Sequence, residues 1–242
     1  SKGRRRYKTD WREPKLLIIY VVGEKGRIDR SFSPYIDATL SGPDAVFGLI
    51  SYYLNLLQVT KADQVLFVAD GARWIWLRVA ELIKRFNLSE NCTYQLVDFY
   101  HAVEHLGKIA ELKKGWKPAE RKRWVKKHRR LLLKGKIDQV IIEIKSVCRG
   151  RNSIKIIKEQ NYFIRNRERM QYQQVAAQRL PIGSGAVESA IRRVINLRLK
   201  GASIYWLEEM AEAMLLLRSY YKAGRWNTLK HFAFSIPLTT VA

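Results

Sequence analysis

The sequence is poor in cysteine, in acidic residues and in long apolar runs. Its 242 residues include only two cysteines, Cys92 and Cys148, and neither belongs to a C-x-x-C pair. A disulfide framework or a cysteine-rich zinc cluster is therefore not expected, and we interpret both residues as reduced, partly buried thiols. No apolar run approaches the roughly 18 residues of a membrane-spanning helix, and no secretory signal opens the chain. We therefore expect a cytoplasmic protein with no membrane partner.

The shortage of acidic residues leaves a strong positive charge. Lysine and arginine number 45 against 22 acidic residues, which gives a net charge of +23 and a pI of about 10.2. This balance favours a polyanionic partner, and nucleic acid is the first candidate. The densest stretch is residues 121–136, where nine of the sixteen positions are Lys or Arg. A solvated helix face remains the alternative interpretation of this stretch.

Apolar periodicity predicts an α/β core interrupted by a helical block. Strand-like runs occupy residues 15–22, part of 27–40, 64–69 and 93–97, and helical spacing occupies 45–57 and 74–86. From residue 106 to about 180 nearly everything has the pattern of helices. Two more helices are predicted at 186–199 and 205–222, and the tail after residue 226 is weakly patterned. Alternating strands and helices indicate an α/β fold, and the helical block is a candidate inserted subdomain.

Three carboxylates occupy positions that suit metal chemistry. Asp70 and Asp98 each end a predicted strand, and Glu188 lies in the first turn of a helix opened by Gly183-Ser184-Gly185. Open α/β sheets place their functional groups at the carboxyl ends of strands, and we expect the strand before Asp70 to be buried on both faces. Carboxylates from neighbouring strands and a flanking helix can hold two divalent ions for phosphodiester chemistry, and Mg²⁺ prefers such oxygen ligands.

Each of these residues also has a purely structural interpretation. Asp70 precedes a glycine and is typical of a turn, Asp98 is placed to cap the next helix, and Glu188 complements a helix dipole. A local match competes with the metal hypothesis as well. His101 to His105 (HAVEH) fits the H-x-x-E-H pattern of a zinc protease family. The pattern directly follows a strand, and a charge of +23 has no evident use in a protease.

One helix stripe combines a carboxylate with potential phosphate contacts. Glu188, Arg192 and Asn196 recur every four residues, so that they share a face of the predicted helix. Val194 and Ile195 belong to the opposing apolar face, and we expect it to be buried.

Four blocks of the sequence resemble bacterial insertion-sequence transposases of the Kra type. They are VLFVADGARWIW, LVDFYHAVEHL, ERKRWVKKHRRLLLKGK and PIGSGAVESAIRRVINLRLKGASIYWLEEMAEAMLLLRSYY. These transposases are relatives of the Mutator-like enzymes, which carry a DDE active site on a ribonuclease-H-like fold. The resemblance extends from about residue 11 to residue 226.

The resemblance implies functional roles for particular residues. Asp70 corresponds to the second acidic residue of the DDE triad and Glu188 to the third, and these two would be the catalytic, metal-binding residues. Asp98 and His101 match the D-x-x-H signature, which we interpret as structural or DNA-positioning. The implied cofactor is a pair of Mg²⁺ ions. The implied partners are insertion-sequence ends and target DNA in the bacterial nucleoid, bound by a homo-oligomer. Residues expected to contact DNA are Arg121, Arg123, Lys126, Lys127, Arg129, Arg130, Arg192, Arg193 and Asn196.

The resemblance also implies a domain layout with one departure from the family. The layout is a basic segment at 1–14, a ribonuclease-H-like core at 15–105 and 181–226, a helical insertion at 106–180 and a tail at 227–242. The family's first catalytic Asp lies on the first strand of the core, whereas residues 15–22 contain no acidic residue. Asp10, Asp29 and Asp37 are poor substitutes, because none lies in an apolar run. We therefore expect a carboxy-terminal fragment that starts after the first strand, and a DNA-binding remnant without catalysis is the alternative function.

Overall fold

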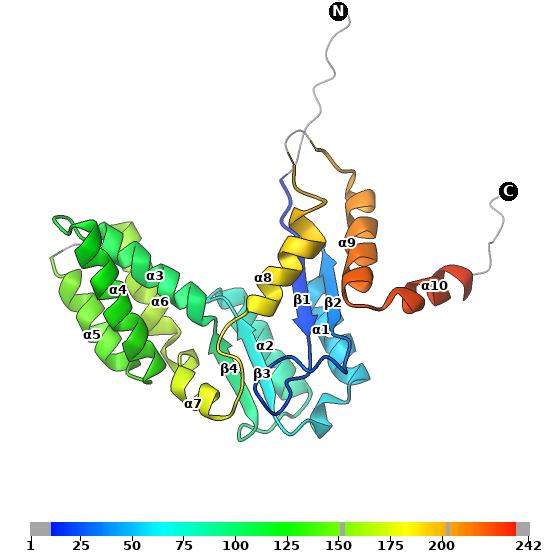
Figure 1. Cartoon of the computed structure of the whole chain (residues 1–242), viewed down its shortest axis with the longest axis horizontal. Coiled ribbons are helices and arrows are strands. Elements are labelled where there is room, and N and C mark those ends of the chain that lie inside the picture. Colours follow the sequence, from blue (N-terminus) through cyan, green and yellow to red (C-terminus); the bar gives the residue numbers. More distant parts are fainter. Residues whose placement is uncertain (1–10, 151–152, 202–203, 236–242) are drawn as a thin grey trace, which may run out of the picture. The chain divides into compact units, whose positions relative to one another are not determined.

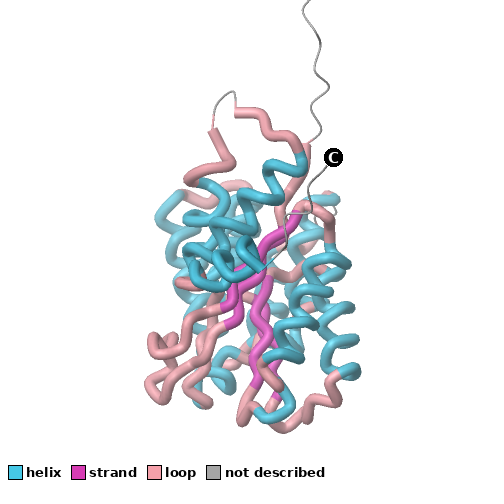
Figure 2. Tube along the Cα trace, turned by 90° about the vertical axis from the view of Figure 1, so that its right-hand side faces the viewer, coloured by secondary structure: helices cyan, strands magenta, loops and turns pink. Residues whose placement is uncertain are grey.

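Helices predominate over a few short strands in this α/β chain, as Figure 2 shows in cyan and magenta. The structure is a computed structural model that describes residues 11–150, 153–201 and 204–235, and it is 58% helical and 10% strand. The chain divides into two compact units, which are considered separately here. The first contains the described residues of Ser1–Tyr20, Ser31–Tyr53 and Ala186–Ala242, and the second contains Val21–Arg30 and Leu54–Gly185.

The first unit is built on an antiparallel strand pair. Strand β1 (Lys15–Ile19) pairs with β2 (Tyr35–Thr39), with Leu17 opposite Asp37. The predicted strand at 15–22 is shortened, because Val22 forms a separate bridge to Ile28 across the expected turn. The helices that begin in this unit or lie within it are α1 (Pro43–Leu56), α8 (Gly185–Ile191), α9 (Glu208–Lys222) and α10 (Trp226–Ser235) (Figure 1). Helix α10 lies in the tail, where no element was predicted.

The core of the first unit lies between β2 and the helices α8 and α9. Its fully or nearly buried members are Ile36, Ala38, Ala190, Val194, Ile195, Leu215 and Ala223. The prediction that Val194 and Ile195 face inward is confirmed.

The helix predicted at 186–199 is not a single α-helix. After α8 the chain continues as a π-helix over Arg192–Asn196, whose wider turn shifts the backbone hydrogen bonds. Arg218 of α9 compensates: its Nε donates to the carbonyls of Val194 (3.0 Å) and Arg193 (3.2 Å). Side-chain capping of those carbonyls explains how the irregular turn persists, and the sequence pattern contained no sign of it.

The second unit contains a parallel strand pair with an intervening helix. Strand β3 (Val65–Ala69) pairs with β4 (Thr93–Val97), and α2 (Arg73–Arg85) connects them. The existence of all three elements is confirmed. The expectation that β3 is buried on both faces is wrong, because each of its residues is only half-buried. Among the described residues β3 has a single strand neighbour, β4.

The remainder of the second unit is helical. It contains α3 (Phe99–Leu112), α4 (Pro118–Leu133), α5 (Ile137–Val147), α6 (Ile154–Arg165) and α7 (Tyr172–Ala177), with short 3-10 turns at Val59–Lys61 and Arg167–Arg169. Helices α3 and α5 both contact α4 and α6, so that four helices enclose one core (Figure 1). That core is lined by Leu106, Ile109, Leu132, Ile144 and Phe163, each at most 1% exposed. The expectation that the described residues of 106–180 contain only helices and turns is confirmed.

Candidate functional site

The carboxylates Asp70 and Asp98 follow two adjacent parallel strands. Ala69 at the end of β3 lies opposite Val97 at the end of β4, and the Asp98 amide donates to the Ala69 carbonyl at 2.8 Å. Because parallel strands end at the same edge, Asp70 and Asp98 both lie at the carboxyl edge of the sheet. The sequence prediction for this part of the site is confirmed.

Asp70 combines a turn role with an accessible carboxylate. Its Oδ1 accepts a hydrogen bond from the Ala72 amide at 2.8 Å, and its carbonyl accepts one from Trp76 Nε1 at 2.9 Å. The turn interpretation is therefore confirmed. The residue is exposed, and no hydrogen bond within the described chain uses its Oδ2. That oxygen is available to a ligand.

Asp98 is consumed by backbone hydrogen bonds. It is 1% exposed, and its Oδ1 accepts from the His101 amide at 2.8 Å, which caps α3. Its Oδ2 accepts from the Ser184 amide. Both oxygens are occupied, so Asp98 fixes the start of α3 and the loop that precedes α8 and is not free to bind a metal. The helix-cap interpretation is confirmed.

Two glycines allow the segments around these carboxylates to approach closely. A Cβ on Gly71 would lie 2.3 Å from Cε2 of Tyr162, and a Cβ on Gly183 would lie 2.7 Å from Cε2 of Tyr100. Real Cβ atoms do not approach that closely, so only glycine fits at either position. Gly71 thus places Asp70 against α6, and Gly183 places the loop before α8 against α3.

Glu188 belongs to the first unit, whereas Asp70 and Asp98 belong to the second. It lies in the first turn of α8 and is exposed, as are Arg192, Arg193 and Asn196. The exposure of the predicted stripe is confirmed. The π-helix at Arg192–Asn196 means that Asn196 does not follow Arg192 at α-helical spacing.

A buried polar cluster behind Asp70 was missed by the sequence analysis. His105 Nδ1 lies 2.5 Å from Glu159 Oε2, and the His105 ring stacks on Tyr162 with centroids 3.5 Å apart. Burial lowers the pKa of His105, although Glu159 opposes that effect. The available signal was Glu159 itself, because it occupies the same stripe of α6 as the buried Ile156 and Phe163.

The second histidine of the H-x-x-E-H pattern is therefore engaged with α6. His101 lies one turn earlier on α3, and its Nδ1 is buried without a hydrogen-bond partner in the described chain, 3.9 Å from Asp98 Oδ1. Neither histidine belongs to a group of three or more His, Cys, Asp or Glu side chains arranged around a metal position within the described residues.

The donor chemistry at Asp70 and Glu188 fits a hard divalent cation. Both side chains are exposed carboxylates, and Mg²⁺ is held in proteins by one or two carboxylates together with water and substrate oxygens. Asp98 does not fit this role, since its oxygens already accept two amide protons.

Asp37 is buried in the middle of β2, contrary to the expectation that it lies outside any apolar run. Its carboxyl accepts from the Tyr53 hydroxyl at 2.7 Å and from the Ala38 amide at 2.8 Å. Burial raises the pKa of Asp37, with a smaller opposing effect from Tyr53. These contacts give Asp37 a structural role within the first unit, and Asp10 lies outside the described residues.

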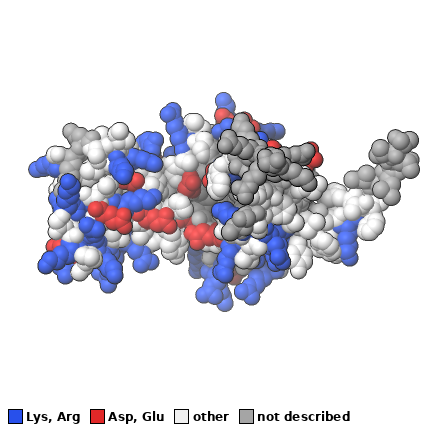
Figure 3. All heavy atoms as spheres, turned by 90° about the horizontal axis from the view of Figure 1, so that it is seen from above, with Lys and Arg blue, Asp and Glu red and all other residues white. Residues whose placement is uncertain are grey.

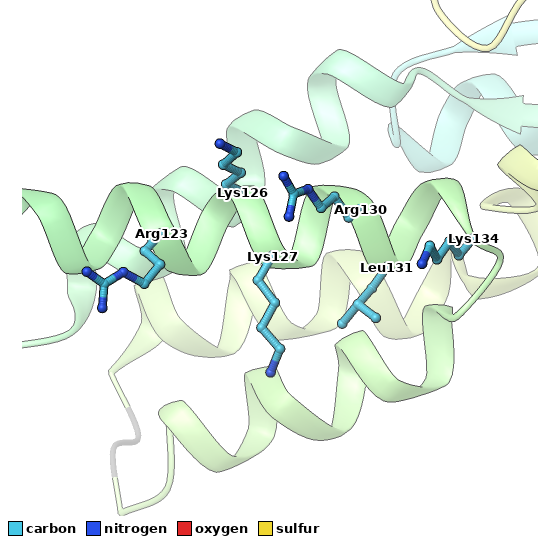
Figure 4. Close-up of a pocket in the computed structure, with 6 residues that line it drawn as sticks. All are labelled: Arg123, Lys126, Lys127, Arg130, Leu131 and Lys134. Atoms are coloured by element: carbon cyan, nitrogen blue, oxygen red, sulfur yellow. The ribbon is translucent and has the colours of Figure 1, made fainter.

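Helix α4 carries the densest cationic surface. Arg123, Lys126, Lys127, Arg129 and Arg130 are exposed, and Arg121 is half-buried. Part of this surface is a hollow of about 460 Å³, which we call the α4 hollow, lined by Arg123, Lys126, Lys127, Arg130, Leu131 and Lys134 (Figure 4).

The α4 hollow keeps most of its charge unneutralised. In Figure 4, Lys127 points toward the neighbouring helix, where it forms an ion pair with Glu143 at 2.6 Å, whereas Lys126 and Arg130 point away. Figure 3 shows Lys and Arg distributed widely over one face of the molecule, with fewer acidic side chains. The hollow therefore suits an anion with repeated charges.

No family model, curated protein or solved structure matches this chain. Within the described residues, no helix is both long enough and apolar enough to cross a membrane. Both cysteines are thiols outside any disulfide, Cys92 half-buried and Cys148 buried, as expected.

Proposed function

We propose that this chain is the carboxy-terminal part of a DDE transposase that resembles the Kra type of insertion-sequence enzyme. The observation that carries the proposal is the position of Asp70. It lies in an exposed turn at the carboxyl edge of a parallel strand pair, with one oxygen free for a ligand. The sequence blocks described above and the net charge of +23 support it further.

The proposed division of labour follows the local geometry. Asp70 and Glu188 hold divalent cations, together with a third carboxylate that the resemblance assigns to an upstream strand of a ribonuclease-H-like core. Asp98 acts as a positioning residue, since it connects the start of α3 to Ser184, four residues before Glu188. His101 supports it through the backbone amide that Asp98 accepts. When bound, two Mg²⁺ ions stabilise the attacking and leaving oxygens of a phosphodiester.

The cationic side chains would hold the DNA backbone. Arg192 and Arg193 lie on the exposed part of the helical segment that begins with Glu188, and the α4 hollow offers a second row of cations. Phosphate contacts of this kind position DNA without reading its sequence. The 106–180 segment is then a helical insertion whose role is to hold DNA, in a homo-oligomer assembled on insertion-sequence ends.

A cleavage assay tests the proposal. The restored full-length protein is incubated with DNA that contains the element's ends and Mg²⁺, and strand cleavage is measured. We expect cleavage to be lost in Asp70→Ala and in Glu188→Ala, because each removes a metal ligand. Asp63→Ala is the matched control, since Asp63 is an exposed acid just before β3 and should be dispensable. Cleavage that persists in both site variants refutes the assignment.

A second candidate function is DNA binding without cleavage. The unneutralised cations of the α4 hollow favour it, because they bind phosphates whether or not a metal site is complete. DNA binding by the 242-residue chain that weakens steeply with salt, without nicking, would support this function.

A further inference from the structure

The hydroxyl of Tyr162 is buried without a hydrogen-bond partner in the described chain. Tyr162 lies on α6 and is 6% exposed. A buried hydroxyl left unsatisfied costs about 1–3 kcal/mol, and native structures contain few such groups. A partner that is not part of this chain would remove the cost.

The ring of Tyr162 is held in one orientation. One face stacks on His105, with an interplanar angle of 18°, and His105 Nδ1 donates to Glu159, because a carboxylate only accepts. One ring edge lies against Gly71, next to Asp70, where a side chain would collide with it. The hydroxyl is therefore fixed in place by α3, α6 and the turn after β3.

The surroundings of the hydroxyl are negatively charged. Burial raises the pKa of Tyr162, and Asp70, Asp98, Glu159 and Glu104 raise it further. The phenol thus stays protonated in a negative local potential, within a chain whose net charge is +23. Asp98 and Glu159 are neutralised in part by their hydrogen bonds, whereas Asp70 Oδ2 has none within the described chain. The missing partner is a cation or the water that surrounds one.

We propose that Tyr162 is a contact residue for the cation site at Asp70, and that its hydroxyl hydrogen-bonds a water in the shell of the divalent ion. This inference rests on the proposed function, in which Asp70 is a metal ligand. Small divalent cations lose their water reluctantly, so a protein holds them through few direct ligands and several water-mediated contacts. His105 and Glu159 are positioning residues, since they act only by holding the Tyr162 ring.

Manganese titration of the 242-residue chain tests the inference directly. Free Mn²⁺ is measured by electron paramagnetic resonance for the wild type, Asp70→Asn, Tyr162→Phe and Tyr172→Phe. We expect Asp70→Asn to abolish the site and Tyr162→Phe to weaken it about threefold to tenfold, the loss of one hydrogen bond. Tyr172→Phe is the matched control, because its hydroxyl is equally buried and unpartnered in the described chain but its ring contacts Phe99. Its Mn²⁺ affinity should be unchanged.

A second measurement identifies the water-mediated contact. Hexaamminecobalt(III) imitates a hydrated ion and cannot bind a carboxylate directly, so it should compete with Mn²⁺ more weakly in Tyr162→Phe than in the wild type. Equal Mn²⁺ affinity in Tyr162→Phe and the wild type overturns the inference, as does a wild type without Mn²⁺ binding that depends on Asp70. Neither result decides the cleavage assay on the full-length protein, so the two proposals fail separately.

Discussion

At the scale of single residues, the absence of a side chain at Gly71 matters as much as the carboxylate beside it. The backbone of the turn after β3 touches the Tyr162 ring, and the Asn166 amide nitrogen lies 2.8 Å from the position of a Cβ. Asn166 Nδ2 in turn donates to the Tyr162 carbonyl at 2.9 Å. Neither neighbour can move without breaking a packed or hydrogen-bonded arrangement, so the position of Asp70 depends on this glycine.

We predict that Gly71→Ala destabilises the protein by about 1–3 kcal/mol, the usual cost of forcing extra atoms into a packed site. Urea unfolding followed by circular dichroism measures the change. Gly107→Ala is the control, because Gly107 lies within α3 with no heavy atom within 4 Å of a Cβ. Alanine there should be neutral or stabilising, as expected in a helix interior. Equal stability of the two variants would show that the turn does not pack against Tyr162.

At the scale of elements, two buried histidines connect the helices of the second unit. His105 joins α3 to α6 through Glu159. His128 is fully buried on α4, where it stacks on Trp124 and lies 2.9 Å from Glu143 of α5. Burial lowers the pKa of both histidines, although the neighbouring carboxylates oppose the effect. Their neutral forms are therefore favoured in the folded state.

The lowered pKa values predict that stability rises with pH in the weakly acidic range. An unfolded histidine titrates near 6.5, so below that pH the unfolded chain binds protons that the folded chain does not. The free energy of unfolding should therefore fall as the pH drops from about 7 toward 5. Urea unfolding at several pH values measures it. Replacing both residues (His105→Gln and His128→Gln) should flatten this dependence, and a wild type that is more stable in the acidic part of this range than at neutral pH contradicts the prediction.

The π-helix after α8 depends on one arginine from another helix. Arg218 donates to the carbonyls of Arg193 and Val194 while its stem covers part of α9. We predict that Arg218→Met, which keeps the length of the stem, makes amide hydrogens of residues 192–197 exchange at least several-fold faster, since carbonyl capping is lost. Hydrogen exchange read by mass spectrometry measures this. Arg198→Met is the control, because Arg198 is exposed beyond the π-helix; equal exchange in both variants would contradict the role of Arg218.

At the scale of the whole molecule, the positive charge is the most general property. We predict that DNA affinity falls linearly with salt on logarithmic axes, and that neutralising the α4 hollow reduces the slope by about 0.9 for each DNA phosphate that the variant no longer binds. The hollow is neutralised by changing Arg123, Lys126, Arg130 and Lys134 to Gln. The control makes the same change at four exposed lysines: Lys25, Lys61, Lys84 and Lys155. Fluorescence anisotropy with labelled duplex measures both, and equal slopes in the two variants would exclude the α4 hollow as the DNA surface.

The sequence by itself determined most elements and the residues worth testing. Local apolar periodicity is sufficient to predict β4 at Thr93–Val97, the helical character of the 106–180 segment and the inward face of Val194 and Ile195. Charge and chain composition likewise need no tertiary information. Asp70 and Asp98 could be placed at strand ends because residues of a strand and its successor are adjacent in the chain.

Only the tertiary structure decided what those residues contact. Asp98 gives both oxygens to amides, one of them from Ser184, and that bond joins residues far apart in sequence. The stack of His105 on Tyr162, the close approach at Gly71 and the capping of the π-helix by Arg218 also join distant segments. A local pattern records the preferences of neighbouring residues. It does not record which distant side chain fills a gap or satisfies a carbonyl, because that depends on how the packed helices and strands meet.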